Sequence, residues 1–298
     1  MSEMEALAGK FEAHRPHLRA VAYRMLGSIG ESEDAVQEAW LRLSRSDTAA
    51  VDNLGGWLTT VVGRICLDML RSRTTRREEP LTGEDGGFRL PDPVVTGLAG
   101  IDPEHEILTA DSVGIALLVV LDTLSPAERL AFVLHDLFAV PFDEIAPVLG
   151  RTAAGTRQLA SRARRRVQGA APDQDADRAR TREIVDAFLA AARGGDLGAL
   201  LDLLDPEVVA RSDGGTLRPG LVRRGARDVA SQAIMFARFA EAARPVLING
   251  FPGVLSRSSD GSPLSLMAFT VRGGRIAALD ILADPERLAA LTAGTLPG

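Results

Sequence analysis

Apolar residues recur at helical spacing through most of residues 1–168, and short runs with the character of β-strands follow after residue 200. In the stretch PFDEIAPVLG, Phe142, Ile145, Ala146 and Leu149 occupy positions i, i+3, i+4 and i+7, which predicts a short helix with one apolar face. Pro147 lies inside this helix and has no backbone donor, so we expect it to bend or shorten the helix. The pattern predicts an all-α beginning and a mixed end.

Two breaks divide the chain. Leu81–Pro103 holds eight glycines and prolines in 23 residues without a sustained period, which is typical of a linker, and Gln168–Ala179 is a shorter break. We therefore expect several domains: a helical domain at 1–80, a linker at 81–107, a second helical domain at 108–169 and an α+β domain at 178–298.

The last domain combines helices with an antiparallel sheet. Ile184, Phe188, Leu189 and Ala192 predict an amphipathic helix, and a short helix should follow Asp196. A strand at Glu207–Arg211, a helix in GARDVASQAIMFARFAEAA and strands in RPVLING, GVLSRS, PLSLMAFTVRGG and RIAALDIL come next. Helices followed by a meandering sheet indicate an α+β layer.

The stretch GRTAAGTRQLASRARRRVQ predicts the second half of a helix-turn-helix. Gly150 suits the left-handed end of the preceding helix, and Thr152 can cap the next one. In that helix Leu159, Ala163 and Val167 share an apolar face.

The same stretch has six arginines and no carboxylate, although the chain carries a net charge of -6. We expect Arg157, Gln158, Ser161 and Arg162 to contact bases or the nearby backbone, and Arg164–Arg166 to hold phosphates. A solvated basic face is the alternative, but the helix-turn-helix pattern favours DNA.

Two further helices are expected near the N-terminus. In GESEDAVQEAWLRL, Ser32 can cap a helix that buries Ala35, Ala39, Trp40 and Leu43. Its exposed polar face would carry Asp34, Gln37 and Glu38.

The next helix should begin near Asn53. Its apolar stripe consists of Leu54, Trp57, Leu58, Val61, Val62, Ile65 and Met69. Trp57 is more readily explained as a core anchor than as a platform for stacked bases. The four arginines of Arg71–Arg77 could bind nucleic acid or complement the helix dipole.

Composition excludes several classes of protein. One cysteine, Cys66, excludes a disulfide framework and a cysteine-based zinc site, and the four histidines lack ligand spacing. No apolar run has the length of a membrane span, and the first residues lack the order of a signal peptide. We therefore expect a cytoplasmic protein that does not contact a membrane and has no metal, no cofactor and no catalytic residue.

DAVQEAWLRL, NLGGWLTTVVGRICLDMLRSR and the stretch from LDTLSPAERL to ASRARRRV together resemble regions two and four of an extracytoplasmic-function sigma factor. The resemblance covers most of residues 1–168. It implies that RNA polymerase core enzyme and promoter DNA are the partners and that catalysis belongs to the polymerase. An alternative sigma factor would supply promoter choice and strand opening.

The resemblance also assigns sites. It places the surface that binds core polymerase at Asp34, Gln37 and Glu38. It places contacts with the minus ten element at Asn53, Trp57, Arg64, Arg71 and Arg73, and contacts with the minus thirty-five element at Arg151, Thr152, Thr156, Arg157, Gln158, Ser161, Arg162 and Arg165.

Residues 178–290 resemble the SnoaL-like cone, an extension found in sigma factors of the sigma-J type. The motifs RLPDP, SDGGT and DPERL resemble short motifs of that type, although SDGGT has a threonine where glycine or a basic residue is expected. The resemblance implies that the cone regulates the sigma domains in cis and that no separate anti-sigma factor is required. The regulatory contacts would be Leu90, Pro91, Asp213, Gly214, Gly215, Asp284, Pro285 and Leu288.

Two other hypotheses stay open. A ligand-responsive regulator would bind duplex DNA tightly without polymerase, whereas a sigma factor should bind weakly until core polymerase is added. A SnoaL-like enzyme fused to a DNA-binding module would use Asp213 or Asp280 as a base, but the cone has no histidine or tyrosine to complete such a site. A small-molecule ligand in the cone is a further expectation.

Overall fold

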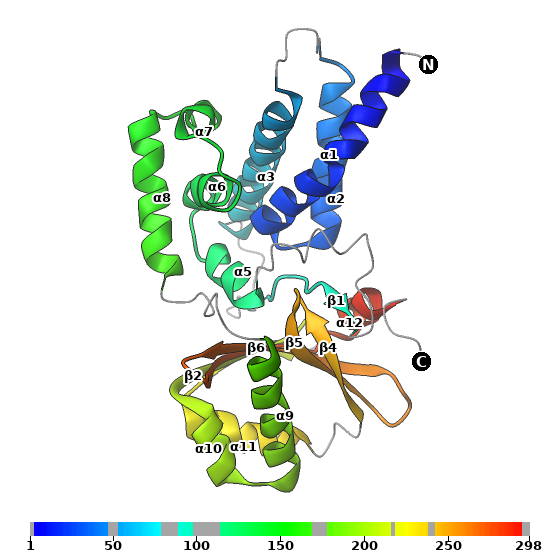
Figure 1. Cartoon of the computed structure of the whole chain (residues 1–298), viewed down its shortest axis with the longest axis vertical. Helices are drawn as coiled ribbons and strands as arrows, with labels where there is room; N and C mark the ends of the chain where they lie inside the picture. The colour runs from blue at the N-terminus through cyan, green and yellow to red at the C-terminus, as the bar shows by residue number, and fades with distance from the viewer. Residues whose placement is uncertain are drawn as a thin grey trace. The chain divides into compact units, whose positions relative to one another are not determined.

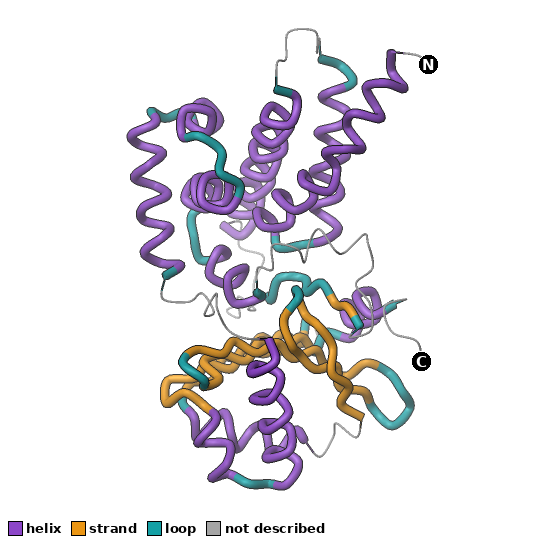
Figure 2. Tube along the Cα trace, in the orientation of Figure 1, coloured by secondary structure: helices purple, strands orange, loops and turns teal. Residues whose placement is uncertain are grey.

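The computed structural model describes residues 3–46, 53–78, 89–97, 114–168, 178–215, 218–237 and 242–293 (Figures 1 and 2). The chain divides into two compact units. Unit 1 comprises Met1–Gly83 and Leu118–Ala170, and unit 2 comprises Glu84–Leu117 and Ala171–Gly298. Most of the two helical domains that the sequence predicts therefore forms one unit, and most of the predicted linker belongs with the C-terminal domain.

The first half of unit 1 is a three-helix bundle of α1 (Glu3–Leu26), α2 (Ile29–Leu43) and α3 (Leu54–Glu78). Its core is fully buried and includes Leu18, Val21, Met25, Val36, Leu43, Leu58 and Val62. The helix α3 begins directly after Asn53, near the residue expected from the sequence, and Asn53 Oδ1 caps it by accepting a hydrogen bond from the Gly56 backbone N–H at 3.0 Å. Of the apolar stripe that the sequence predicts for α3, Leu58, Val62 and Ile65 are buried, whereas Leu54, Trp57, Val61 and Met69 are half-buried.

The start of α2 differs from the prediction. The helix begins at Ile29, after Ser28 in extended conformation, so Ser32 lies inside it and donates a hydrogen bond to the Ser28 carbonyl oxygen. Gly27, at φ 68°, ends α1 immediately before this point. Because the glycine completes the turn so early, α2 starts before the serine that was expected to cap it.

The second half of unit 1 consists of short helices. They are α5 (Ile115–Asp122), which begins in unit 2, α6 (Pro126–Phe132), the π-helical turn η1 (Val133–Leu137), α7 (Phe142–Leu149) and α8 (Ala153–Val167). Gly150 adopts the left-handed conformation at φ 63°, and Thr152 Oγ1 accepts from the Gly155 N–H at 3.1 Å. The predicted helix-turn-helix of α7 and α8 is confirmed, and α7 ends two residues beyond Pro147.

Unit 2 contains a seven-stranded sheet in the order β1-β4-β5-β6-β7-β2-β3. The strands are β1 (Val95–Thr96), β2 (Leu204–Gly214), β3 (Arg218–Arg224), β4 (Ala242–Ile248), β5 (Phe251–Arg257), β6 (Pro263–Arg272) and β7 (Arg275–Leu282). Only β2 and β7 pair in parallel; the other neighbours are antiparallel. The predicted α+β class is confirmed, with a sheet that is larger than the sequence indicates.

Three helices cover one face of this sheet: α9 (Arg178–Gly194), α10 (Leu197–Leu203) and α11 (Ala226–Ala237) (Figure 1). Phe188 of α9 packs edge-on against Phe269 of β6, with ring centroids 5.5 Å apart, at the centre of a continuous apolar core. A fourth helix, α12 (Pro285–Thr292), follows the last strand. The space between helices and sheet is therefore filled by side chains.

Two strands were missed by the sequence reading. The edge strand β3 exposes Leu221, Val222, Arg223 and Arg224 in succession, so its sequence shows no alternation. The strand β1 lies in the expected linker and pairs with β4, with Val95 opposite Ile248. Because residues 89–97 are bound to the sheet, this part of the chain is not a free linker. We call residues 89–97 the strap.

Candidate functional site

The polar face of α2 is exposed as predicted. Asp34 and Gln37 are exposed, and Glu38 is half-buried and paired with Arg42 at 2.9 Å between Oε1 and Nε. Leu41, which the sequence reading did not single out, is 39% exposed and follows Gln37 and Glu38 by one helical turn. The face thus combines a carboxylate, an amide and an uncovered apolar side chain.

The candidate residues at the start of α3 and within it differ in exposure and in whether other residues of the protein already bind them. Asn53, Arg64 and Arg71 are exposed, and Trp57 is half-buried. Arg73, by contrast, forms an ion pair with Glu31 and donates to the Leu26 carbonyl oxygen at 3.2 Å. Arg73 connects the end of α3 to the turn between α1 and α2, so any DNA contact would compete with this role.

On α8 and the two residues before it, the structure separates exposed candidates from a buried one. The exposed candidates are Arg151, Thr152, Arg157, Gln158, Ser161, Arg162 and Arg165. Thr156 is fully buried, and its hydroxyl donates to the Thr152 carbonyl oxygen at 3.0 Å. In this conformation Thr156 stabilises the helix and does not reach the surface.

Two arginines of α8 form ion pairs with side chains of other helices. Arg164 forms an ion pair with Asp136, and Arg166 Nη1 lies 3.3 Å from Glu128 Oε2. Arg157 lies over the Phe142 ring, 5.3 Å from its centroid. Arg164 and Arg166 would have to leave these partners to hold phosphates as expected. Arg165 has an exposed side chain and no such partner among the described residues.

In unit 2 the three motif segments converge on one largely buried arginine, Arg287, that the sequence reading missed; its side chain is 13% exposed. Arg287 Nη1 donates to Asp213 Oδ2 at 2.6 Å, and Arg287 Nη2 donates to the Leu90 carbonyl oxygen at 2.7 Å and to Asp92 Oδ1 at 2.6 Å. Asp213 Oδ2 also accepts from the Leu90 N–H at 2.8 Å. We call Leu90, Asp92, Asp213 and Arg287 the Arg287 clasp.

The turn after β2 fits tightly against the start of α12. Asp213 Oδ1 accepts from the Gly215 N–H at 3.0 Å, and Gly215 has φ 66°. A Cβ atom on Gly215 would lie 2.2 Å from Asp284 Oδ2, so any other residue here would have to displace the Asp284 side chain and adopt a strained backbone angle. Asp284 in turn caps α12 by accepting from the Glu286 and Arg287 N–H groups.

The remaining regulatory candidates belong to the same region. Gly214 is buried at the end of β2, Pro285 is the first residue of α12, Leu288 is 1% exposed, and Pro91 is buried in the strap. Asn249 adds a second attachment: its Oδ1 accepts from the Val94 N–H and its own N–H donates to the Val94 carbonyl oxygen, both at 2.8 Å. Asn249 hydrogen-bonds to the backbone of Val94 as a neighbouring strand would, but it lies far from Val94 in the sequence. No local sequence pattern indicates this contact, so the sequence reading missed Asn249.

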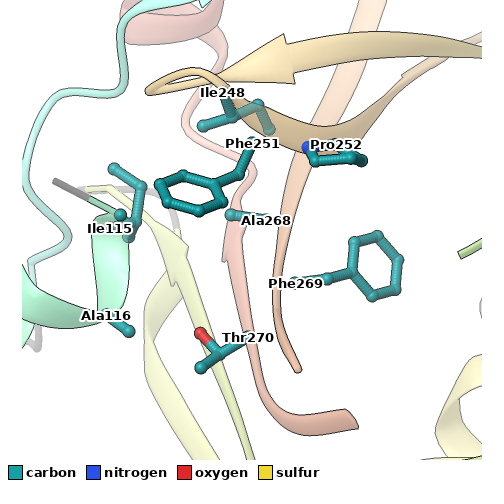
Figure 3. Close-up of a pocket in the computed structure, with 9 residues that line it drawn as sticks. Ile115, Ala116, Ile248, Phe251, Pro252, Ala268, Phe269 and Thr270 are labelled. Atoms are coloured by element: carbon teal, nitrogen blue, oxygen red, sulfur yellow. The ribbon is translucent and has the colours of Figure 1, made fainter. Parts of the chain in front are cut away.

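The strap covers the sheet face opposite the helices. A cavity of about 10 Å³ lies between Leu90, Pro91 and Pro93 of the strap and Leu266, Asp280 and Leu282 of the sheet. A second cavity, of about 20 Å³, is lined by Ile115 and Phe251, and Figure 3 shows the Phe251 ring between Ile115 and Ala268 while Phe269 points to the other side. Each cavity has room for about one water molecule. Neither could hold an organic substrate.

Asp280 is the one carboxylate in these cavities. Arg211 Nη1 donates to its Oδ1 at 2.9 Å, whereas Oδ2 has no hydrogen-bond partner among the described residues. Burial raises the pKa of Asp280, although the Arg211 charge opposes the shift. Asp213 is saturated by Arg287, Leu90 and Gly215. Asp280 Oδ2 is unpaired but buried beside a cavity with room for about one water molecule, so neither aspartate offers an oxygen that a substrate could reach.

Within the described ranges, no helix is long and apolar enough to cross a membrane. Nor do the described residues bring together three His, Cys, Asp or Glu side chains that could hold a metal ion.

Comparisons with known proteins identify related sequences and structures. Residues 11–76 match the family model Sigma-70 region 2, and residues 115–167 match Sigma-70, region 4. The chain is 42% identical over 294 residues to the ECF RNA polymerase sigma factor SigJ of Mycobacterium tuberculosis, which covers 93% of this chain and 92% of that protein. It is 35% identical over 299 residues to the "Probable ECF RNA polymerase sigma factor SigI" of the same species, with 98% of each covered.

The fold matches as well. The crystal structure of the Mycobacterium tuberculosis extracytoplasmic function sigma factor SigJ superposes with a TM-score of 0.76 at 37% identity, over 95% of this chain and 98% of that one. The match therefore includes the C-terminal α+β domain as well as the two sigma regions. With its region 2 bundle, its region 4 helix-turn-helix and its C-terminal α+β domain, this chain belongs to the extracytoplasmic-function sigma factors and acts as an alternative RNA polymerase sigma factor.

Proposed function

We propose that three helices of the chain bind three different partners: α2 binds core polymerase, α3 contacts the minus ten element and α8 contacts the minus thirty-five element. The observation that supports this most directly is the separation on α8. Seven polar and basic candidates are exposed, while Leu159, Ala163 and Val167 are buried against the rest of the unit. A recognition helix needs this two-sided character.

We infer that region 2 occupies residues 1–80 and region 4 residues 108–169, which the family matches at 11–76 and 115–167 support. The two cavities described above each have room for about one water molecule, and residues 178–298 contain no histidine or tyrosine, so we infer a regulatory and not an enzymatic role for the cone. We further infer a cytoplasmic protein that needs no separate anti-sigma factor.

We infer that regulation in cis acts through the strap. Its residues lie between the two sigma regions in sequence, yet the Arg287 clasp and Asn249 bind them to the cone. The cone therefore limits how far the two promoter-binding regions can separate. A full-length Arg287→Ala chain should alter promoter-specific transcription with core polymerase, and unchanged output and unchanged promoter choice would refute this role.

Core binding can be tested separately. Asp34→Lys reverses a charge on the exposed face of α2 and should weaken the binding of core polymerase at least tenfold without changing the melting temperature. Glu183→Lys makes the same change on the exposed side of α9 and serves as the control. If the two variants bind core polymerase equally well, the assignment of α2 is wrong.

A further inference from the structure

The Phe142 ring stands at the outer end of the apolar stripe of α7. Ile145, Ala146 and Leu149 of that stripe are buried, whereas Phe142, the first residue of the helix, is half-buried. The three buried residues already pack α7 against the rest of unit 1, and a partly exposed ring adds less to that packing than a buried one would. The contacts of the ring with η1 and α8 indicate a second role.

His135 of η1 supports the Phe142 ring. The two rings are stacked, with centroids 3.7 Å apart and an angle of 27° between their planes. His135 is itself held, because its Nδ1 lies 3.0 Å from the Val140 carbonyl oxygen, and a carbonyl oxygen can only accept, so Nδ1 donates. The turn between η1 and α7 is closed by backbone hydrogen bonds from the Ala139 N–H to the His135 carbonyl oxygen at 3.1 Å and from the Val140 N–H to the Leu134 carbonyl oxygen at 2.9 Å. Phe142 thus packs on a side chain that this turn fixes in place.

Arg157 of α8 contacts the same ring through its positive charge. Its Cζ lies 5.3 Å from the Phe142 centroid, which is within the range of a cation–π contact. Such a contact uses none of the N–H donors of the guanidinium, so all of them stay available for a ligand. Among the described residues, the Arg157 side chain forms no ion pair and no hydrogen bond that would compete for these donors. The contact therefore holds the side chain and leaves its donors free.

Two other exposed arginines of α8, Arg162 and Arg165, differ from Arg157. Within the described part of the chain, neither side chain contacts a ring, forms an ion pair or donates a hydrogen bond. A free arginine samples many rotamers, so its ordering opposes binding, and it can turn from a base edge to a nearby phosphate. An arginine that is already ordered loses less entropy and turns less readily, so a wrong base leaves its donors unsatisfied. Discrimination between bases is therefore expected above all from Arg157.

We propose that Phe142, supported by His135, is a positioning residue that holds the Arg157 guanidinium for contact with one base pair of the minus thirty-five element. This role rests on the proposed contact of α8 with that element. Arg157 then donates to O6 and N7 of a guanine, the base edge that matches the fork of its guanidinium. Phe142 touches no base, but it sharpens the preference at this one position.

The hold on Arg157 can be measured without DNA or polymerase. NMR relaxation of the Arg157 Nε–H in the free full chain should show an ordered side chain, with Arg162 as the mobile reference. Phe142→Leu keeps an apolar side chain in α7 but removes the aromatic face, so Arg157 should become as mobile as Arg162. Phe142→Tyr keeps the ring and should leave Arg157 ordered. An Arg157 side chain that is as mobile as Arg162 in the unsubstituted chain would overturn the proposal.

Base preference is measured by transcription with core polymerase from a promoter library that varies each position of the minus thirty-five element. Arg157→Ala should abolish the preference at one base pair and so identify the position. Phe142→Leu should reduce the preference there by about two- to fivefold, the factor expected for loss of an exposed cation–π contact. Phe142→Tyr should retain it. A uniform loss over all positions, or an unchanged preference at this one, would refute the positioning role.

Combined substitutions distinguish positioning of Arg157 from a general effect on α7. In an Arg157→Ala background, Phe142→Leu should not change the preference at this position further, whereas in an Arg162→Ala background it should have its full effect. Equal effects in the two backgrounds would mean that Phe142 acts on the packing of α7 against α8 and not through Arg157.

His135→Ala provides the test should Phe142→Leu fail to fold. It removes the ring on which Phe142 is stacked, so Arg157 should be less ordered and the preference at the same base pair should fall. An unchanged preference would overturn the proposal. If Arg157→Ala alters no base preference, the proposed contact of Arg157 with DNA fails and the positioning role fails with it, whereas a mobile Arg157 in the free chain overturns the positioning role alone.

Discussion

Arg287 and Asp213, 74 residues apart in sequence, form a charged hydrogen bond of 2.6 Å in which both side chains are nearly buried. The same guanidinium holds the strap through the Leu90 carbonyl oxygen and Asp92. Three segments of the chain thus depend on one side chain. Because paired charges of this kind are satisfied only together, loss of the arginine leaves two carboxylates without their cation.

Arg287→Ala should release the strap. We expect the free energy of unfolding to fall by about 3 kcal/mol, as when one partner of a buried ion pair is removed. Trypsin should cleave after Arg89 faster, because the exposed Arg89 precedes the released Leu90. Urea unfolding and a timed digest measure the two effects.

The matched control is Arg193→Ala. This arginine is exposed in the last turn of α9 and lies outside the clasp. Its removal should change stability by less than about 0.5 kcal/mol. Equal cleavage after Arg89 in the two variants would contradict the role of the clasp.

Gly215→Ala should lower the free energy of unfolding by more than the strained backbone angle at residue 215 alone would. An alanine at φ 66° costs about 1 kcal/mol, and here its Cβ would also lie 2.2 Å from the Asp284 carboxylate that caps α12. We expect a total loss of about 2 to 4 kcal/mol in the free energy of unfolding. Gly261→Ala, at φ 84° with nothing within 4 Å, isolates the backbone cost. Equal losses would mean that Asp284 simply moves aside.

Sequence reasoning succeeded where the signal is local. The α7 and α8 pair was predicted because Gly150 and Thr152 specify the turn and a single apolar stripe specifies the buried side. The amphipathic helix α9 was predicted for the same reason, because Ile184 and Phe188 are apolar residues one helical turn apart.

It failed where the cause lies elsewhere in the chain. The strap has no periodicity because Val95 pairs with Ile248 across 153 residues, and its prolines suit an edge that donates few hydrogen bonds. For the site, exposure of Arg162 was predictable from helical geometry. The engagement of Arg73 by Glu31 and of Arg164 by Asp136 was not, because each carboxylate comes from another element.

Arg162 and Arg165 are both exposed on α8 but should act differently on DNA. If Arg162 contacts a base edge, Arg162→Ala should cost about 1 to 3 kcal/mol on the preferred minus thirty-five sequence and relax the preference at one position. If Arg165 contacts phosphate, Arg165→Ala should weaken all sequences alike and reduce the salt slope of binding by about one. Transcription with core polymerase across a promoter library and a salt series distinguishes these outcomes. A uniform loss for Arg162→Ala would reassign it to the backbone.

The buried Asp280 should make the stability of the cone depend on pH. Its pKa is raised above the ordinary 3.8 because burial disfavours the carboxylate, although Arg211 partly compensates. The folded state therefore binds the proton more tightly than the unfolded state. The resulting stabilisation is fully present below pH 3.8 and is lost as pH rises through the folded-state pKa.

Asp280→Asn removes that titration while keeping the shape and the acceptor oxygen that faces Arg211. Urea unfolding of the parent and the variant at pH 3.5, 5 and 7 should show the parent losing stability relative to Asp280→Asn as pH rises. The difference should appear only in the transition that reports on unit 2, because Asp280 and Arg211 both belong to it. Parallel pH profiles for the two chains would mean that Arg211 fully compensates the burial and that the pKa of Asp280 is the same in the folded and the unfolded chain.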